Sequence, residues 1–122
     1  MSRLLVVDDD ADILEALVVV LQDRHEITSA NNGLEALGLL QAQPFDAIVL
    51  DLMMPSMDGE TLIERMREAA IRVPVVLASA SFDVAVIAVR LGVEHVQKPY
   101  DISVLEEKLV RLIRGATPTS FG

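Results

Sequence analysis

Apolar residues follow two different patterns along the chain. Short continuous apolar runs, such as residues 4–7 (LLVV) and 47–50 (AIVL), are typical of parallel strands that are buried on both faces. Longer segments, in which apolar residues recur every three or four positions, indicate helices. The pattern predicts strands at residues 4–7, 25–30, 47–50, 73–77 and 94–97, and helices at residues 13–21, 34–43, 60–69, 82–91 and 102–114.

The first predicted helix contains one segment that suits a strand better. Residues 18–20 are three valines in succession, and β-branched side chains lose rotamer freedom in a helix. The helical prediction depends on the flanking residues Ile13, Leu14, Leu17 and Leu21, which lie at helical spacing.

Strand and helix alternate five times, which predicts an α/β domain with a doubly wound, five-stranded parallel sheet and helices on both faces. In such flavodoxin-like sheets, with strand order 2-1-3-4-5, ligands bind beyond the carboxyl ends of the strands, where the order reverses between strands 1 and 3. Asp8 and Asp9 follow the first predicted strand, and Asp51 follows the third. We therefore expect these carboxylates to lie together at one edge of the sheet.

Asp51 begins the stretch DLMMPSMDG at residues 51–59, where a buried run gives way to a loop. An aspartate exposed at the end of a strand can coordinate a cation or attack an electrophile, whereas an unpaired charge inside the strand is costly. Taken alone, Asp51 could be an ordinary turn residue. The second acidic group, at Asp8 and Asp9, favours the functional interpretation.

The predicted carboxyl edge also offers groups that could hold a phosphoryl group. Mg²⁺ would relieve the repulsion among three carboxylates, because it prefers oxygen ligands. Zinc is disfavoured, since the chain has no Cys and only two His. Ser79 offers a hydroxyl and Lys98 a cation, although each alone could be an ordinary turn or surface residue. Together with a nucleophilic Asp, they favour phosphoryl chemistry.

Composition limits the class of protein. The length of 122 residues fits one domain, and the 52% of apolar residues excludes a disordered chain. The chain has 19 acidic and 10 basic residues, and this excess of negative charge argues against direct nucleic-acid contact by the domain. The apolar runs 16–21 and 84–89 are much shorter than the roughly 20 residues of a membrane-spanning helix. No signal peptide is evident, so we expect a cytoplasmic protein without membrane contact.

Four short motifs fall at the ends of the predicted strands: VVDD at residues 6–9, DLMMPSMDG at 51–59, VVLASA at 75–80 and KP at 98–99. In this order, on a five-fold alternation of strand and helix, they resemble the receiver domain of bacterial two-component response regulators. The resemblance covers residues 4–114. It implies a receiver domain at residues 1–114, followed at 115–122 by a flexible tail or the start of a linker.

The resemblance implies a role for each residue at the predicted edge. Asp51 would accept a phosphoryl group from a phosphohistidine on a sensor histidine kinase or a phosphotransfer protein. Asp8 or Asp9, together with Asp51 and the backbone carbonyl of Met53, would bind Mg²⁺ or Mn²⁺. Lys98 would contact the phosphoryl oxygens.

A switch is implied as well. Ser79 would move toward the phosphoryl group and bias a two-state surface formed by the fourth helix, the fifth strand and the fifth helix. The Lys98–Pro99 peptide bond would be cis. An aromatic residue usually takes part in the switch three positions before the lysine, but His95 stands there in this chain. A plain surface histidine on an edge strand is an equally good interpretation of His95.

Two further features depart from the usual family pattern. Only 19 positions separate Ser79 from Lys98, so we expect the fourth helix or its flanking loops to be short. Met53 and Ser81 occupy positions that modulate dephosphorylation in the family, and neither supplies an acid or an amide to orient water. We therefore expect a moderately long-lived phosphoryl state.

The main functional hypothesis is a phosphorylation-switched signalling domain that acts on a downstream protein or a fused effector domain. Such a domain is not a turnover enzyme, since its chemistry is limited to self-phosphorylation and slow autodephosphorylation. We expect a monomer or a phosphorylation-promoted homodimer. The alternative is an unphosphorylated, receiver-like interaction module whose acids only cap helices. A small Mg²⁺-dependent phosphatase is a weaker third hypothesis.

Overall fold

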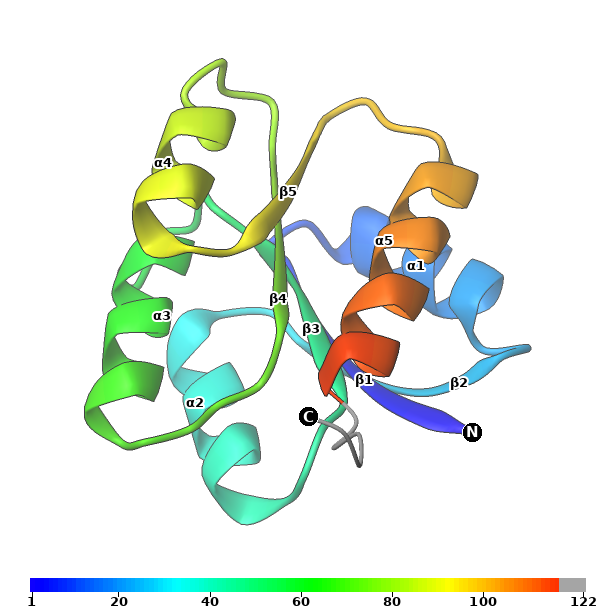
Figure 1. Cartoon of the computed structure of the whole chain (residues 1–122), viewed down its shortest axis with the longest axis horizontal. Coiled ribbons are helices and arrows are strands. Elements are labelled where there is room, and N and C mark those ends of the chain that lie inside the picture. The colour runs from blue at the N-terminus through cyan, green and yellow to red at the C-terminus, as the bar shows by residue number, and fades with distance from the viewer. Residues whose placement is uncertain (117–122) are drawn as a thin grey trace.

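Five strands and five helices alternate along residues 1–116, the part of the chain that the computed structural model describes (Figure 1). All strand pairs are parallel, and the order is β2-β1-β3-β4-β5, which confirms the predicted topology. The strands are β1 (Ser2–Val7), β2 (His25–Ala30), β3 (Ala47–Asp51), β4 (Val75–Ser79) and β5 (Glu94–Gln97). The helices are α1 (Ala11–Leu21), α2 (Gly33–Ala42), α3 (Gly59–Glu68), α4 (Val84–Leu91) and α5 (Ile102–Ala116).

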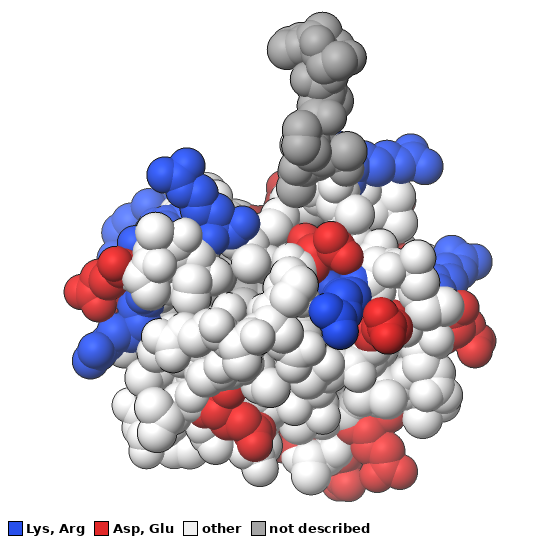
Figure 2. Space-filling view, turned by 90° about the horizontal axis from the view of Figure 1, so that it is seen from below, with Lys and Arg blue, Asp and Glu red and all other residues white. Residues whose placement is uncertain are grey.

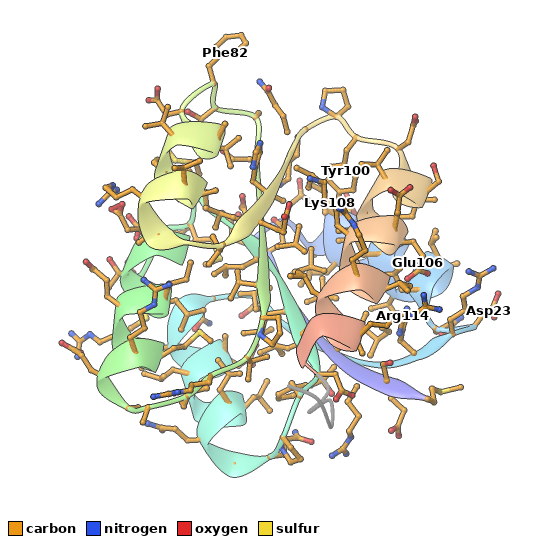
Figure 3. The ribbon with its side chains drawn as sticks, in the orientation of Figure 1. Asp23, Phe82, Tyr100, Glu106, Lys108 and Arg114 are labelled. Carbon is orange, nitrogen blue, oxygen red and sulfur yellow. The ribbon has the colours of Figure 1, made fainter. Side chains whose placement is uncertain are left out.

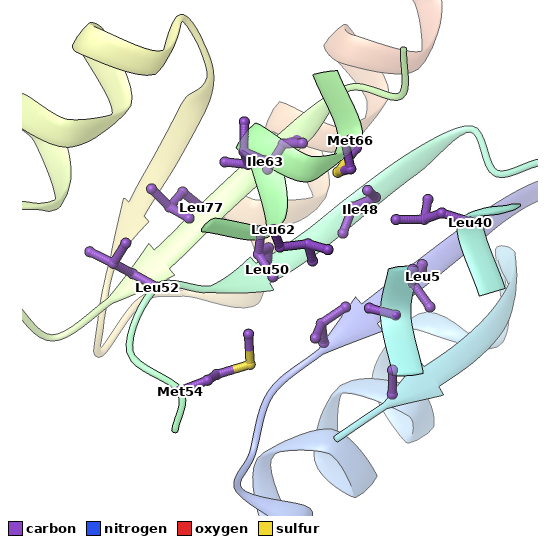
Figure 4. Packing of buried hydrophobic residues seen from close by; sticks show 14 of the residues in the cluster. Leu5, Leu40, Ile48, Leu50, Leu52, Met54, Leu62, Ile63, Met66 and Leu77 are labelled. Carbon is purple, nitrogen blue, oxygen red and sulfur yellow. The ribbon is translucent and has the colours of Figure 1, made fainter. Parts of the chain in front are cut away.

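The sheet is buried on both faces. Helices α2, α3 and α4 pack on one face, and α1 and α5 pack on the other (Figure 1). Side chains alternate along each central strand, so that Leu5 and Val7 of β1 face the first layer, whereas Leu4 and Val6 face the second. Figure 4 shows the first of these layers, in which leucine, isoleucine and methionine side chains fill the space between β1, β3, β4 and the helices.

Local capping explains where the helices begin and end. The side chains of Asp10, Asn32 and Asp58 accept hydrogen bonds from backbone N–H groups in the first turns of α1, α2 and α3. Helix α4 ends at Gly92, whose φ of 72° is a left-handed conformation that favours glycine. The three valines at 18–20 lie within α1, as the flanking residues predicted.

Several boundaries differ from the predicted ones. Strand β4 begins two residues later than predicted and includes Ser79. Helix α4 begins at Val84 rather than at residue 82, because residues 81–83 form a turn in which the Ser81 hydroxyl accepts the Asp83 N–H. At eight residues, α4 is short, as predicted. Helix α5 continues to Ala116, and the rest of the predicted tail, residues 117–122, lies outside the described residues.

No helix in the described part of the chain is both long and apolar enough to cross a membrane.

Gly59 allows the loop after β3 to fold back against its own strand. A Cβ atom at this position would lie 2.7 Å from the Asp51 carbonyl oxygen and 3.0 Å from the Leu52 Cα. We expect Gly59→Ala to lower the free energy of unfolding by about 1–3 kcal/mol, because backbone atoms must move to accept the methyl group.

Gly38 provides the matched control, since a Cβ atom there meets nothing within 4 Å. Gly38→Ala lies inside α2 and is expected to raise the free energy of unfolding by roughly 0.5–1 kcal/mol. Urea unfolding followed by circular dichroism measures both variants. Equal effects of the two substitutions would show that the close approach at Gly59 does not matter.

Candidate functional site

Three carboxylates meet at the carboxyl edge of the sheet. Asp8 and Asp9 follow β1, and Asp51 is the last residue of the neighbouring strand β3. The pairing of Val7 with Leu50 brings these strand ends level with each other. Each residue offers a carboxylate oxygen, and these oxygens lie within 4.8 Å of one another. The fold thus brings Asp51 together with Asp8 and Asp9, which lie 43 and 42 residues before it along the chain.

Asp51 is more enclosed than the sequence predicted. It lies inside β3, and only 6% of its surface is exposed, whereas the sequence predicted an exposed residue after the strand. The N–H of Leu52 donates to the Ala78 carbonyl, and the N–H of Gly59 donates to the Leu52 carbonyl. These bonds extend the sheet past the predicted strand end and hold the following loop close to the acid.

Lys98 joins the two buried acids. Its Nζ lies 3.0 Å from Asp8 Oδ2 and 3.4 Å from Asp51 Oδ1. The backbone N–H of Lys98 donates to the Ser79 carbonyl at 2.8 Å, which fixes the start of the loop after β5. The peptide bond between Lys98 and Pro99 is cis.

The balance of burial and neighbouring charges raises the pKa of both Asp51 and Lys98. Burial and the neighbouring Asp8 charge raise the pKa of Asp51 to about 6, although Lys98 and the Met53 N–H favour the ionised form. Burial disfavours the charged form of Lys98. The hydrogen bond to Asp8 and the charges of both acids outweigh burial, so the pKa of Lys98 is raised. Lys98 therefore stays cationic beside an acid that carries a proton more readily than usual.

The acid cluster fits a hard divalent cation. Its donors are all carboxylate oxygens, and Asp9 is exposed while Asp8 and Asp51 are buried, which leaves one side open to solvent. The repulsion by Asp8 that helps to raise the pKa of Asp51 is the kind of repulsion that a bound cation relieves. Met53 donates its N–H to Asp51 Oδ1 at 3.3 Å, so its backbone lies beside the cluster.

The predicted switch and modulator residues surround this cluster. Ser79 is the last residue of β4 and is 1% exposed, and its hydroxyl accepts the N–H of Ser81. The side chain of Met53 is exposed. His95 lies on β5, away from the acids, and lines a hollow of about 270 Å³ with Tyr100 and residues of α5.

The raised pKa of Asp51 leads to a prediction about how the free energy of unfolding depends on pH. The pKa is about 6 in the folded protein and 3.8 in its ordinary state, so the folded state binds more protons between these values. The contribution of Asp51 to the free energy of unfolding therefore falls as pH rises from 3.8 to about 6, and the penalty from this group is complete above that range. Without metal at pH 8, we expect Asp51→Asn to raise the free energy of unfolding by about 1–2 kcal/mol, a gain that disappears near pH 4.

Urea unfolding in a chelating buffer at the two pH values measures this gain. Asp83→Asn is the control, because Asp83 is exposed and its side chain caps no helix. An Asp51→Asn variant that is less stable than the original chain at pH 8 would contradict the prediction.

One buried pair was not found from the sequence. His25, at the start of β2, is 5% exposed, and its Nε2 lies 2.7 Å from Glu106 Oε1 on α5. The Nδ1 atom of His25 has no partner among the described residues. The two residues are 81 positions apart, and no local pattern links them.

A parallel sheet of this order, with an acid cluster and a lysine at its carboxyl edge, is the arrangement that the resemblance to receiver domains implied. A sequence model of the response regulator receiver domain matches residues 4–110. The transcriptional regulatory protein PrrA of Mycobacterium leprae is 38% identical over 97% of this chain and 53% of its own length. The CpxR homologue of Haemophilus influenzae is 32% identical over 98% of this chain and 54% of its own length.

Solved structures agree with these relatives. The receiver domain of the Francisella response regulator 1452 superimposes with a TM-score of 0.89 at 30% identity, over 96% of this chain and all of that domain. The chemotaxis protein CheY4 of Vibrio cholerae gives a TM-score of 0.82 at 28% identity, over 92% of this chain and 98% of its own. The chain therefore belongs to the response regulator receiver domain family. It spans about half the length of the two regulators above.

Proposed function

We propose that this receiver domain is a phosphorylation-switched signalling module and that Asp51 accepts the phosphoryl group. The observation that carries the proposal is the contact of one lysine with two buried acids, beside a third acid that is exposed. Response regulators receive phosphate from histidine kinases, and receiver domains are signalling domains rather than turnover enzymes. A sensor histidine kinase or a phosphotransfer protein is the proposed donor.

In the proposed reaction, a carboxylate oxygen of Asp51 attacks the phosphorus of a phosphohistidine. A new O–P bond forms, the N–P bond breaks, and the imidazole leaves with the electron pair of that bond. Lys98 lies where its ammonium group can contact the phosphoryl oxygens. Asp8, Asp9, Asp51 and the Met53 carbonyl would hold Mg²⁺ or Mn²⁺, which supplies positive charge to the transferring group.

The proposed switch begins at Ser79. Its hydroxyl accepts the Ser81 N–H, and Ser81 in turn accepts the Asp83 N–H just before α4. Movement of Ser79 toward a phosphoryl group on Asp51 would pull on this chain of bonds and shift the start of α4. Output through α4, β5 and α5, to a downstream protein or a fused effector domain, is the proposed consequence.

A stripe of exposed apolar side chains lies along α4 and the turn before it and offers a surface for such output. Phe82, Val86 and Val89 are 89%, 69% and 80% exposed and follow one another at helical spacing. Figure 3 shows Phe82 projecting from the turn before α4. This exposed stripe also favours the second candidate function, a constitutive interaction module, because the stripe is present without a phosphoryl group.

His95 on β5 is a proposed participant in the switch.

Slow loss of the phosphoryl group is a further part of the proposal. The exposed side chain of Met53 is a thioether, and the Ser81 hydroxyl already accepts the Asp83 N–H. Neither supplies an acid or an amide that could orient an attacking water. We propose a moderately long-lived aspartyl phosphate for this reason.

Intact mass spectrometry after incubation with acetyl phosphate and Mg²⁺, followed by an acid quench, tests the proposed function. We expect a phosphoryl adduct that forms with Mg²⁺ and fails to form with a chelator. If the chain binds Mg²⁺ yet forms no adduct with acetyl phosphate or with a phosphorylated histidine kinase, the constitutive interaction module becomes the better explanation.

A further inference from the structure

A hollow of about 770 Å³ opens at the amino ends of the strands and is called here the amino-edge hollow. Its walls are the end of α3 with the loop that follows, the turn between α4 and β5, and Leu112 of α5. The first residues of β4 and β5, Val75 and Glu94, also line it. The acid cluster lies at the carboxyl ends of the strands, so this hollow is separate from the site described above.

Most of the lining of the amino-edge hollow is apolar. Met66 is buried there, and Ile71, Val73, Val93 and Leu112 are half-buried. Ile71, Val73 and Val93 pack against the first core layer but keep part of their surface open to solvent. Small-molecule sites have volumes of roughly 300–1,000 Å³ and combine an apolar lining with a few polar groups. The hollow therefore has the size and the surface to hold the apolar body of a small molecule.

Two arginines line the α3 side of the amino-edge hollow. Arg67 lies in the last turn of α3, and Arg72 lies in the loop before β4. The guanidinium group of Arg67 donates to the Leu91 carbonyl at the end of α4, which uses one of its five N–H donors. The side chain of Arg72 forms no ion pair or hydrogen bond with the described residues. Figure 2 looks onto this edge of the sheet and shows basic side chains gathered on the side of α3.

The acid that lines the amino-edge hollow already has a partner. Glu94 is the one acidic residue among the described residues of the lining, and it accepts a hydrogen bond from Lys108 Nζ at 3.0 Å. This hydrogen bond is the main reason why the pKa of Glu94 is lowered, so the carboxylate stays ionised beside its lysine. The acids of α3 do not line the hollow. The guanidinium of Arg72 and the remaining donors of Arg67 are therefore available to an anion.

We propose that the amino-edge hollow binds a small carboxylic acid with an apolar body, of the kind represented by a medium-chain fatty acid. The carboxylate lies against Arg72 and Arg67, because the guanidinium fork matches the two oxygens of a carboxylate. The apolar body covers Met66, Ile71 and Val93. A singly charged ligand is favoured over a phosphate, since the chain has a net charge of −9 and repels a multiply charged anion. The proposal needs no phosphoryl group at Asp51, so it stands apart from the proposed function.

Three probes separate the charged and the apolar parts of this recognition. Octanoate has both parts, octanol lacks the charge, and acetate lacks the apolar body. We expect octanoate to bind the original chain at least about fivefold more tightly than either of the other two. Methyl NMR spectra recorded during each titration give the Kd and locate the site, and the largest shifts should fall on Met66, Ile71 and Val93.

A charge reversal and a matched control test the role of Arg72. Arg72→Glu should raise the Kd for octanoate about tenfold, because attraction of the carboxylate becomes repulsion. Arg24→Glu makes the same change in net charge at another exposed arginine, outside the hollow, and should raise the Kd by less than about twofold. Circular dichroism shows that each variant is folded, as expected for an arginine whose side chain has no described partner.

Three results would overturn the proposal. The first is the absence of saturable shifts with octanoate in the original chain. The second is a set of shifts centred on Val20 and Val110, which line the groove between α1 and α5 instead. The third is an equal loss of affinity in Arg72→Glu and Arg24→Glu, which would mean that octanoate responds only to the net charge of the chain.

Discussion

The Asp51→Asn variant is expected to show no phosphoryl adduct after incubation with acetyl phosphate and Mg²⁺, under conditions where the original chain gains one. Asparagine keeps the shape of the side chain but removes the nucleophilic carboxylate oxygen. Intact mass spectrometry of the acid-quenched protein gives the answer directly.

Asp83→Asn is again the matched control. Asp83 lies in the turn just before α4 and is exposed to solvent. It should form the adduct to the same extent as the original chain. An adduct on the Asp51→Asn protein would place the acceptor elsewhere and refute the proposed role of Asp51.

Removal of a proposed metal ligand has the second largest expected effect. Asp9→Asn should weaken Mg²⁺ binding by about a hundredfold, because one of three carboxylate ligands is lost from a cation that prefers charged oxygen. Asp9 is the safest of the three to change, since it is exposed and its loss leaves the contacts of Lys98 intact. Isothermal titration calorimetry with MgCl₂ measures the affinity.

Asp12→Asn provides the comparison, since Asp12 is a nearby exposed acid in the first turn of α1 and lies outside the cluster. Its Mg²⁺ affinity should change by less than about twofold, as expected for a screened surface charge. Equal losses in the two variants would mean that Mg²⁺ responds to the general acidity of the chain rather than to the three clustered carboxylates.

Much of the architecture could be predicted because its evidence is local. The continuous apolar runs at residues 4–7 and 47–50 are buried on both faces, and the alternation of strands and helices predicts the parallel sheet, whose order is the flavodoxin-like 2-1-3-4-5. The positions of Asp8, Asp9 and Asp51 at one edge follow from that order. The spacing between Ser79 and Lys98 correctly predicted a short α4.

The remaining features depend on contacts that no local pattern records. The burial of Asp51 comes from backbone bonds to Ala78 and from the loop that Gly59 allows to approach. The pairing of His25 with Glu106 joins residues from opposite ends of the chain. The start of α4 at Val84 depends on the turn at Ser81, which apolar spacing cannot distinguish from a first helical turn.

The contacts of Lys98 with Asp8 and Asp51 can form only after β1, β3 and β5 have all joined the sheet. One ammonium group joins acids from the ends of β1 and β3, and the lysine itself follows β5, the edge strand made last along the chain. A chain that has not yet added β5 holds two acids side by side with no cation between them, which destabilises their ionised forms. The acceptor site is therefore complete only when the whole sheet has formed, so an unfinished chain during synthesis lacks the lysine on which the proposed signal depends.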